Sequence, residues 1–367
     1  ANAAFGPGTG FTVAWSYWIS CWTANATLAV AAVSNLSIVI PRLGDKGSLP
    51  ALVAIGFLWL FTLINLSGIR RAGETQIITL LLKLVPVIGA VLVAAWLLGT
   101  GEGHAAGMAH TQPVSLSAVS GAATLTLFAL LGFESAAVVG DRVRDPERMI
   151  PRATLIGAAA TGLLYLLSCT AVTMLLPVET LQQSNAAYAT FFGTLVSPLA
   201  GDIVAVFAAI AALGALNGFV MLQGEIPRDL AHRGLLPSLF GRDNRFGSPQ
   251  MAQIASSLLA SIVVYANYSR GLAELFTFMV LITTSTAIIL YVVGSLSALR
   301  LEQAGSLRVS PGFAALTLVG FGYSCWAFYG AGIEASLWSV AMTAAGLPIY
   351  LLMRRRGGAA SAPAGRE

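Results

Sequence analysis

One carboxylate stands in the middle of an apolar run of this chain. Glu134 lies in the segment GAATLTLFALLGFESAAVVG (residues 121–140), two residues after Gly132 and directly before Ser135. A charge inside a membrane-spanning helix costs about 3 kcal/mol or more, and it persists mainly where it faces a cavity or a partner. Broken helices at membrane depth are tolerated where they line a site, and a glycine permits such a break. We therefore predict a helix interrupted at Gly132, with Ser135 helping to satisfy the freed backbone and Glu134 facing a binding site.

A second ionisable side chain, Lys83, lies in the apolar segment TLLLKLVPVIG. A buried lysine readily loses its proton, so Lys83 is a candidate for proton coupling. A carboxylate that is partly removed from water binds its proton more tightly, which makes Glu134 the second candidate. Two plainer interpretations stay open, because Lys83 can extend to the membrane surface and Glu134 can cap nearby backbone or hydroxyl groups.

Hydrophobic runs of membrane-spanning length carry these residues. The chain has 367 residues, of which 56% are hydrophobic and only 10% are charged, and its mean hydropathy is +0.79. A soluble domain usually has about 25% charged residues, and a helix needs about 20 apolar residues to cross a bilayer. We predict an all-α polytopic membrane protein with ten spans, at residues 11–36, 50–69, 76–98, 120–140, 154–176, 201–224, 250–268, 275–298, 310–330 and 334–353.

The distribution of basic residues supports these spans. Sixteen of the twenty Lys and Arg residues fall on one side of the proposed topology, whereas Arg42, Lys46 and Arg270 fall on the other. Cytoplasmic loops carry the excess of Lys and Arg, so both ends of this chain are expected in the cytoplasm. We expect one transmembrane domain over residues 1–353 and a disordered cytoplasmic tail over 354–367. Arginines scattered among short loops do not indicate binding to nucleic acid.

Several classes of protein are disfavoured because their motifs are missing. The sequence has no GxxxxGK[ST] loop for ATP phosphates, no GxSxG nucleophile elbow and no HExxH metal motif. Its three cysteines, Cys21, Cys169 and Cys325, lie in apolar spans, which is typical of packing residues and not of disulfides or metal ligands. We expect neither an enzyme nor a bound cofactor or metal, and a secondary transporter is the default for ten spans with a broken, charged helix.

Three segments in the same order resemble the amino acid–polyamine–organocation (APC) transporters. LFALLGFESAAVVGDRVRDPERMIPRA resembles their sixth span and the loop after it, YWISCWTAN their third span, and ALNGF with RDLAHRGLLPSLF their eighth span and its loop. The resemblance is greatest to the arginine/agmatine antiporters and related bacterial amino acid permeases. It implies a five-plus-five inverted-repeat transporter fold with two extra C-terminal helices, of which this chain lacks the first two helices.

The resemblance implies a function for the complete protein. We expect secondary active transport of amino acids or amines across the bacterial inner membrane by alternating access, by exchange or coupled to protons. The absent first span normally supplies a glycine-rich segment that binds the substrate, so we expect that this chain alone does not transport. An inactive truncated paralogue or a structural membrane subunit is the alternative. Members of the family form dimers through their last two spans, so a homodimer is also an open expectation.

The resemblance also assigns aromatic contacts to the substrate. Phe128 stands where the arginine/agmatine antiporters have a tryptophan that stacks on a guanidinium, and Phe219 matches a second aromatic position. Phenylalanine attracts a cation less strongly than tryptophan, so the phenylalanines at these two positions favour neutral amino acids as substrates. For Phe128, a lipid-facing or core position is the alternative interpretation.

Polar contacts are implied on two further spans. Asn25 matches a polar residue near the substrate, and Cys21 and Tyr17 precede it by four and eight residues on the same helical face. On the tenth span of the family, the resemblance favours Thr283 as the hydroxyl that faces the substrate. The alternatives are a hydrogen bond between helices for Asn25 and a hydroxyl bonded to its own helix for Thr283. Lys83 resembles a fifth-span lysine that replaces a sodium ion in some proton-coupled members of the superfamily.

Overall fold

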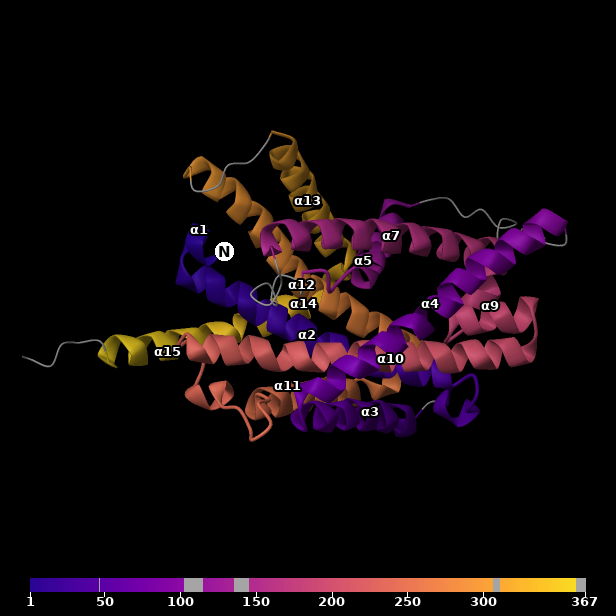
Figure 1. The fold of residues 1–367 in the computed structure, drawn as a ribbon, viewed down its shortest axis with the longest axis horizontal. Coiled ribbons are helices and arrows are strands. Elements are labelled where there is room, and N and C mark those ends of the chain that lie inside the picture. The colour runs from indigo at the N-terminus through magenta and orange to yellow at the C-terminus, as the bar shows by residue number, and fades with distance from the viewer. Residues whose placement is uncertain (46, 102–114, 135–144, 306–310, 361–367) are drawn as a thin grey trace, which may run out of the picture.

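The computed structural model describes residues 1–45, 47–101, 115–134, 145–305 and 311–360, and every regular element in these ranges is a helix (Figure 1). In chain order the elements are α1 (Asn2–Phe5), α2 (Pro7–Leu36), η1 (Pro41–Leu43), α3 (Ser48–Leu66), α4 (Ile69–Thr100), α5 (Leu116–Ala129), α7 (Pro146–Leu175), α8 (Val178–Gln182), α9 (Ala187–Leu195), α10 (Pro198–His232), η4 (Ser238–Gly241), α11 (Gln250–Ala266), η5 (Tyr268–Arg270), α12 (Leu272–Gln303), α13 (Pro311–Gly330), α14 (Gly332–Ala344) and α15 (Gly346–Ala360).

Seven helical segments in the described part of the chain are long and apolar enough to cross a membrane: Ser48–Leu66, Leu82–Thr100, Arg148–Leu175, Pro198–His232, Leu272–Gln303, Pro311–Gly330 and Gly332–Arg355. The apolar helices α5 and α11 are shorter. The 30-residue helix α2 is not among the seven, because its Ser, Thr and Asn residues lower its hydropathy. The chain is therefore an all-helical polytopic membrane protein, and the count of ten spans remains a prediction.

Helix α2 forms the centre of the molecule and packs mainly against α10 and α12. Its sequence is rich in Ala, Ser and Thr, and small residues of this kind let neighbouring helices approach closely in a membrane protein. Its side chains are buried around most of the helix, among them those of Trp18 and Trp22. A helix that is buried on nearly all sides needs no single apolar stripe, and its polar residues must find partners within the protein.

Helix α5 ends at Ala129, well before the end of the apolar run that contains it. Residues 130–134 form turns, and Gly132 has a φ of 110°, a left-handed backbone that L-residues rarely adopt. The structure therefore confirms that the helix ends just before Gly132, and residues 135–144 lie outside the described ranges.

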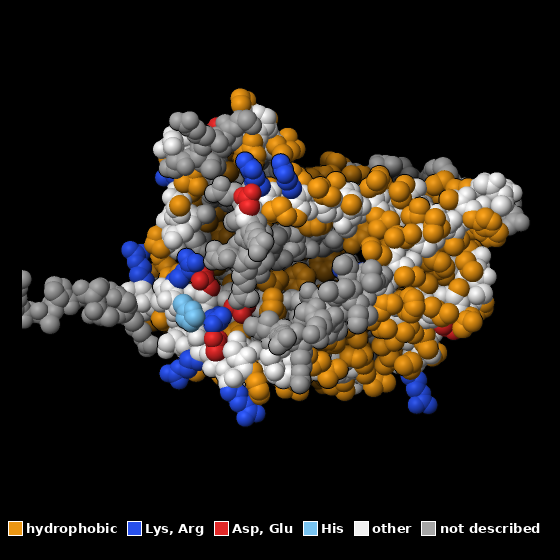
Figure 2. Space-filling model, viewed as in Figure 1, with side chains coloured by type: hydrophobic (Ala, Val, Ile, Leu, Met, Phe, Trp, Pro, Cys, Tyr) orange, Lys and Arg blue, Asp and Glu red, His pale blue; other side chains and the backbone are white. Residues whose placement is uncertain are grey.

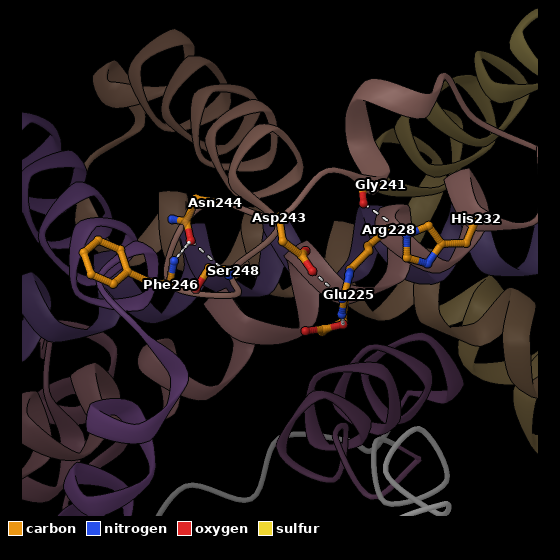
Figure 3. A network of polar contacts seen from close by, with 8 residues as sticks. All are labelled: Glu225, Arg228, His232, Gly241, Asp243, Asn244, Phe246 and Ser248. Carbon is orange, nitrogen blue, oxygen red and sulfur yellow. Dashed lines mark hydrogen bonds and ion pairs between the residues drawn. The ribbon is translucent and has the colours of Figure 1, made fainter.

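Charged side chains gather toward one end of the molecule on the face shown in Figure 2, the end at which α10 finishes, and hydrophobic side chains prevail among the other described residues of this face. Near this end Arg228 contacts Glu225 at 3.1 Å and Asp243 at 2.5 Å (Figure 3). The Oδ1 atom of Asn244 accepts hydrogen bonds from the backbone N–H groups of Phe246 and Ser248. These contacts tie the connection between α10 and α11 to the end of α10.

Two short helices, α8 and α9, lie between α7 and α10 in the chain. Phe191 of α9 is fully buried and Phe192 nearly so, and both belong to a cluster with residues of α4, α7 and α10. The ring of Phe192 lies so close to Gly89 of α4 that a Cβ atom there would come within 2.9 Å of it. Helix α9 is therefore packed into the bundle at one end.

The predicted boundary between the transmembrane domain (residues 1–353) and the tail (residues 354–367) falls near the end of the chain. Helix α15 continues to Ala360, and residues 361–367 lie outside the described ranges. The disordered tail over 354–367 stays a prediction.

Candidate functional site

The carboxylate of Glu134 lies at the break after α5 and accepts two hydrogen bonds on the same oxygen. Its Oε2 atom accepts from the backbone N–H of Gly132 at 2.9 Å and from the hydroxyl of Tyr291, on α12, at 2.8 Å. The turn at Gly132 makes the first bond possible, because it bends the chain back so that a side chain two residues later reaches the freed N–H. Hydrogen bonds to an ionised group are stronger than neutral ones, so these two donors fix the carboxylate.

A cavity of about 700 Å³ lies beside this carboxylate. Small-molecule sites usually have volumes of about 300–1,000 Å³ and combine apolar walls with a few polar groups. The cavity lies among α2, the α5 break, α12 and α13, and it is lined by Tyr17, Leu127, Glu134, Leu290, Tyr291, Gly294, Ser295, Gly320, Tyr323 and Ser324. Three tyrosines and one carboxylate give it the side chains that a small cation prefers.

Tyr17 and Cys21, the two residues of α2 that were predicted to precede Asn25 on the face of the substrate, lie next to this cavity. Tyr17 and Cys21 are buried and pack together with Leu222, and the ring of Phe219 contacts this group. The same ring of Phe219 lies 3.5 Å from the point that a Cβ atom on Gly132 would occupy. Phe219 therefore bridges the α2 group and the break.

The hydroxyl of Tyr17 is buried, and Tyr17 lines the same cavity as Glu134. Among the described residues this hydroxyl makes no hydrogen bond of ordinary geometry. Two tyrosines from different helices thus approach one carboxylate, with Tyr291 bonded to it and Tyr17 beside it. The arrangement joins α2, the break and α12 at a single acidic group.

A second cavity of about 560 Å³ lies on the other side of the break and contains Lys83. Gly132 and Phe133 line it together with the aromatic side chains of Tyr165 and Tyr188. The Tyr188 hydroxyl lies 2.9 Å from the Ser168 hydroxyl. The two residues predicted for proton coupling, Lys83 and Glu134, therefore line different cavities that meet at the break.

Two predicted polar contacts lie outside both cavities. Asn25 is fully buried, and its Nδ2 atom donates to Oε1 of Gln223 on α10 at 2.7 Å. Thr283 is 1% exposed and donates to the backbone carbonyl of Met279 at 2.8 Å, with the Thr27 hydroxyl at 3.4 Å. These are the contacts of the alternative interpretations, a bond between helices for Asn25 and a bond to its own helix for Thr283.

The remaining predicted residues are near the break. Phe128 lies half-buried in the last turn of α5, and it does not line either of the two cavities described above. Ser135 lies outside the described residues. The structure thus brings together Tyr17, Cys21, Phe219, Gly132 and Glu134. Lys83 lines the second cavity on the same break, whereas Asn25, Thr283 and Phe128 line neither of the two cavities.

Sequence reasoning missed Tyr291, which donates to Glu134, and Tyr323, which lines the same cavity. Tyr291 follows Thr283 by eight residues, a spacing that places both on one face of α12, so helical periodicity could have identified it. For Tyr323 the sequence offers no signal, because no predicted site residue lies on α13.

A helical bundle with a helix that ends beside a carboxylate and a cavity is typical of membrane transporters. The family model described as amino acid permease matches residues 1–351 of this chain. The chain therefore belongs to the amino acid permease family, a family of transporters and not of enzymes.

Relatives with known names match most of the chain. The putrescine transporter PotE of Escherichia coli (strain K12) is 26% identical over 358 residues, which are 97% of this chain and 81% of the relative. PotE of Haemophilus influenzae (strain ATCC 51907 / DSM 11121 / KW20 / Rd) is 25% identical over 354 residues, or 95% of this chain and 80% of the relative. The cadaverine/lysine antiporter of Escherichia coli (strain K12) is 29% identical over 273 residues, or 73% of this chain and 61% of the relative.

Proposed function

We propose that this protein transports small amines and amino acids across the bacterial inner membrane by alternating access, through exchange or coupled to protons. Membership of the amino acid permease family supports transport, and the names of the relatives favour diamines and lysine within that class. The observation that carries the proposal is the position of Glu134, whose carboxylate is held at a helix break and lines a cavity of about 700 Å³.

The chemistry of the cavity favours a substrate with an ammonium group. A carboxylate attracts a cation, and the rings of Tyr17, Tyr291 and Tyr323 add aromatic faces that attract a cation by about 0.5–2 kcal/mol each when suitably oriented. The phenylalanines at the two aromatic positions of the arginine/agmatine antiporters weaken the case for a guanidinium. Because phenylalanine still stacks on a planar cation, agmatine and arginine stay among the substrates to be tested.

In the proposed cycle the broken helix contributes the mobile part of the site. The five-plus-five arrangement with two further helices and cytoplasmic chain ends remains part of this proposal. Glu134 and Lys83 would carry the proton linkage from the two cavities that meet at the break. Protonation of Glu134 would remove negative charge from the substrate cavity, which links proton binding to substrate binding.

Transport in liposomes tests the proposal. The protein encoded by the natural gene is reconstituted into liposomes loaded with unlabelled putrescine, and the uptake of labelled putrescine, cadaverine, lysine, agmatine and leucine is measured. We expect saturable uptake of at least one amine that is stimulated by internal substrate or by a proton gradient, and a strong reduction in the Glu134→Gln variant. A properly folded protein that transports none of these compounds would instead support an inactive or structural role.

A further inference from the structure

A chain of four buried side chains crosses the bundle from α3 to α2. The Thr62 hydroxyl on α3 lies 2.7 Å from the Ser257 hydroxyl on α11, and Nε2 of Gln223 on α10 donates to Ser257 at 2.9 Å. At the other end of its amide, Gln223 accepts from Nδ2 of Asn25 on α2 at 2.7 Å. All four side chains have an exposed fraction of 0%.

The direction of every hydrogen bond in this chain is set by a backbone carbonyl at its first end. The single hydroxyl hydrogen of Thr62 is donated to the carbonyl oxygen of Leu58 at 2.7 Å, so Thr62 must accept from Ser257. Ser257 then has only lone pairs to offer Gln223, which must turn its NH₂ group toward Ser257. The carbonyl oxygen of Gln223 consequently faces Asn25, which must turn its own NH₂ group toward Gln223.

The chain ends in an acceptor without a partner. Oδ1 of Asn25 is buried and has no hydrogen bond in the part of the chain that the structure describes. A buried acceptor is costly unless a donor reaches it, and nearly all such groups in proteins have one. Because Gln223 holds the nitrogen, the Asn25 side chain cannot rotate by half a turn to present a donor at this position.

We infer that Gln223 is a positioning residue, which fixes Asn25 so that its Oδ1 accepts a hydrogen bond from an N–H group of the transported amine. Asn25 lies one turn beyond Cys21 and two turns beyond Tyr17, on the face of α2 that meets the Glu134 cavity. The inference rests on the proposed function. Asn25 does not line that cavity in the conformation described here, so the contact belongs to another step of the transport cycle.

The neighbouring residue Ser256 offers a matched control for Ser257. Both serines are on α11 and have an exposed fraction of 0%. The Ser256 hydroxyl accepts from Nε1 of Trp18 at 2.8 Å, and it faces two backbone carbonyls, that of Ala252 at 2.7 Å and that of Gln223 at 3.2 Å. None of these bonds reaches the side-chain amide of Gln223. Replacing either serine by alanine removes one buried hydroxyl of the same size, but only the Ser257→Ala substitution releases the side-chain amide of Gln223.

The test compares two competitors that carry the same charge. The natural gene product and its variants are reconstituted into liposomes, and the uptake of labelled putrescine is inhibited with unlabelled putrescine or with N,N,N-trimethylputrescine, whose quaternary end has no N–H donor. We expect Ser257→Ala to lower the preference for putrescine by about tenfold, because an oriented acceptor for a charged donor is lost. The Ser256→Ala variant should keep the preference of the wild-type protein.

Two further variants separate orientation from stability. Thr62→Ala removes the first side chain of the relay, so it should lower the preference in the same direction even where Ser257→Ala folds poorly. Adding Asn25→Ala to Ser257→Ala should cause no further loss, because the oriented acceptor is already gone. Equal preferences in the wild type, Ser257→Ala and Thr62→Ala would overturn the inference and leave the proposed function intact. A wild-type protein that transports no amine would refute both the inference about Gln223 and the proposed function.

Discussion

The break after α5 depends on the backbone of one residue, and Gly132→Ala is its most direct test. Gly132 has a φ of 110°, where an alanine is strained by about 1–3 kcal/mol. Crowding contributes little, because the added Cβ atom would lie 3.5 Å from the Phe219 ring, an ordinary van der Waals distance. We therefore expect the substitution to lower the free energy of unfolding by about 1–3 kcal/mol through the backbone alone.

Denaturant titration of the purified protein in mixed micelles measures this loss, and two further variants interpret it. Gly56→Ala lies in the middle of α3, where nothing is within 4 Å of an added Cβ atom, so it should stabilise the helix by about 0.5–1 kcal/mol. Phe219→Ala should not rescue Gly132→Ala, because the ring is not the source of the strain. A Gly132→Ala protein as stable as the wild type, or rescue by Phe219→Ala, would refute the argument from backbone conformation.

Three other substitutions address the hydrogen bond at the break, the second cavity and the contact of α5 with α13. Tyr291→Phe removes the 2.8 Å bond to Glu134, so we expect transport to fall by about tenfold or more at unchanged protein yield. Lys83→Ala should abolish the pH dependence of uptake in liposomes, and an unchanged pH profile would remove Lys83 from the coupling mechanism. Gly330→Ala would drive a Cβ atom into the backbone of α5 and should lower the thermal unfolding temperature, whereas Gly322→Ala, with open space around it, should not.

Much of the fold could be predicted because hydropathy and helix length depend on local sequence. The predicted spans at 50–69 and 250–268 agree within a few residues with α3 and α11. The predicted span at 201–224 stopped too early, since α10 continues to His232. The apolar run ends where Glu225 and Arg228 begin, but the two charges form an ion pair along the same helix and let it continue.

The last predicted span shows a different limit. The run at 334–353 was predicted as one span and agrees with the apolar segment Gly332–Arg355, but a single residue, Ala345, separates α14 from α15 within it. Gly346 starts the second helix at a point where an added Cβ atom would lie 2.6 Å from the Trp15 ring of α2. Such a close approach depends on a partner more than 300 residues away in the sequence, and no local pattern reports it.

The candidate site could be predicted only in part for a similar reason. Glu134 was identified because it interrupts an apolar span. Asn25 was identified through the resemblance to the APC transporters, and Tyr17 and Cys21 because they share a helical face with it. In the structure the nitrogen of Asn25 is engaged by Gln223 in a hydrogen bond that links α2 to α10. Residue type and spacing indicate that a polar group needs a partner, and only the packing of the helices decides which partner it has.

Glu134 was interpreted either as a cap for the broken backbone or as a binding group for the substrate, and its position is compatible with both roles at once. The oxygen that accepts from the Gly132 N–H also accepts from Tyr291, so the same group stabilises the break and connects it to α12. A proton on either oxygen makes the carboxyl group neutral, and a neutral acceptor holds these two donors more weakly than a carboxylate does. In the proposed cycle, therefore, proton binding at Glu134 would both remove charge from the cavity and weaken the link between the broken helix and α12. In the proposed cycle, proton binding at Glu134 is thereby coupled directly to the contact between the broken helix and α12.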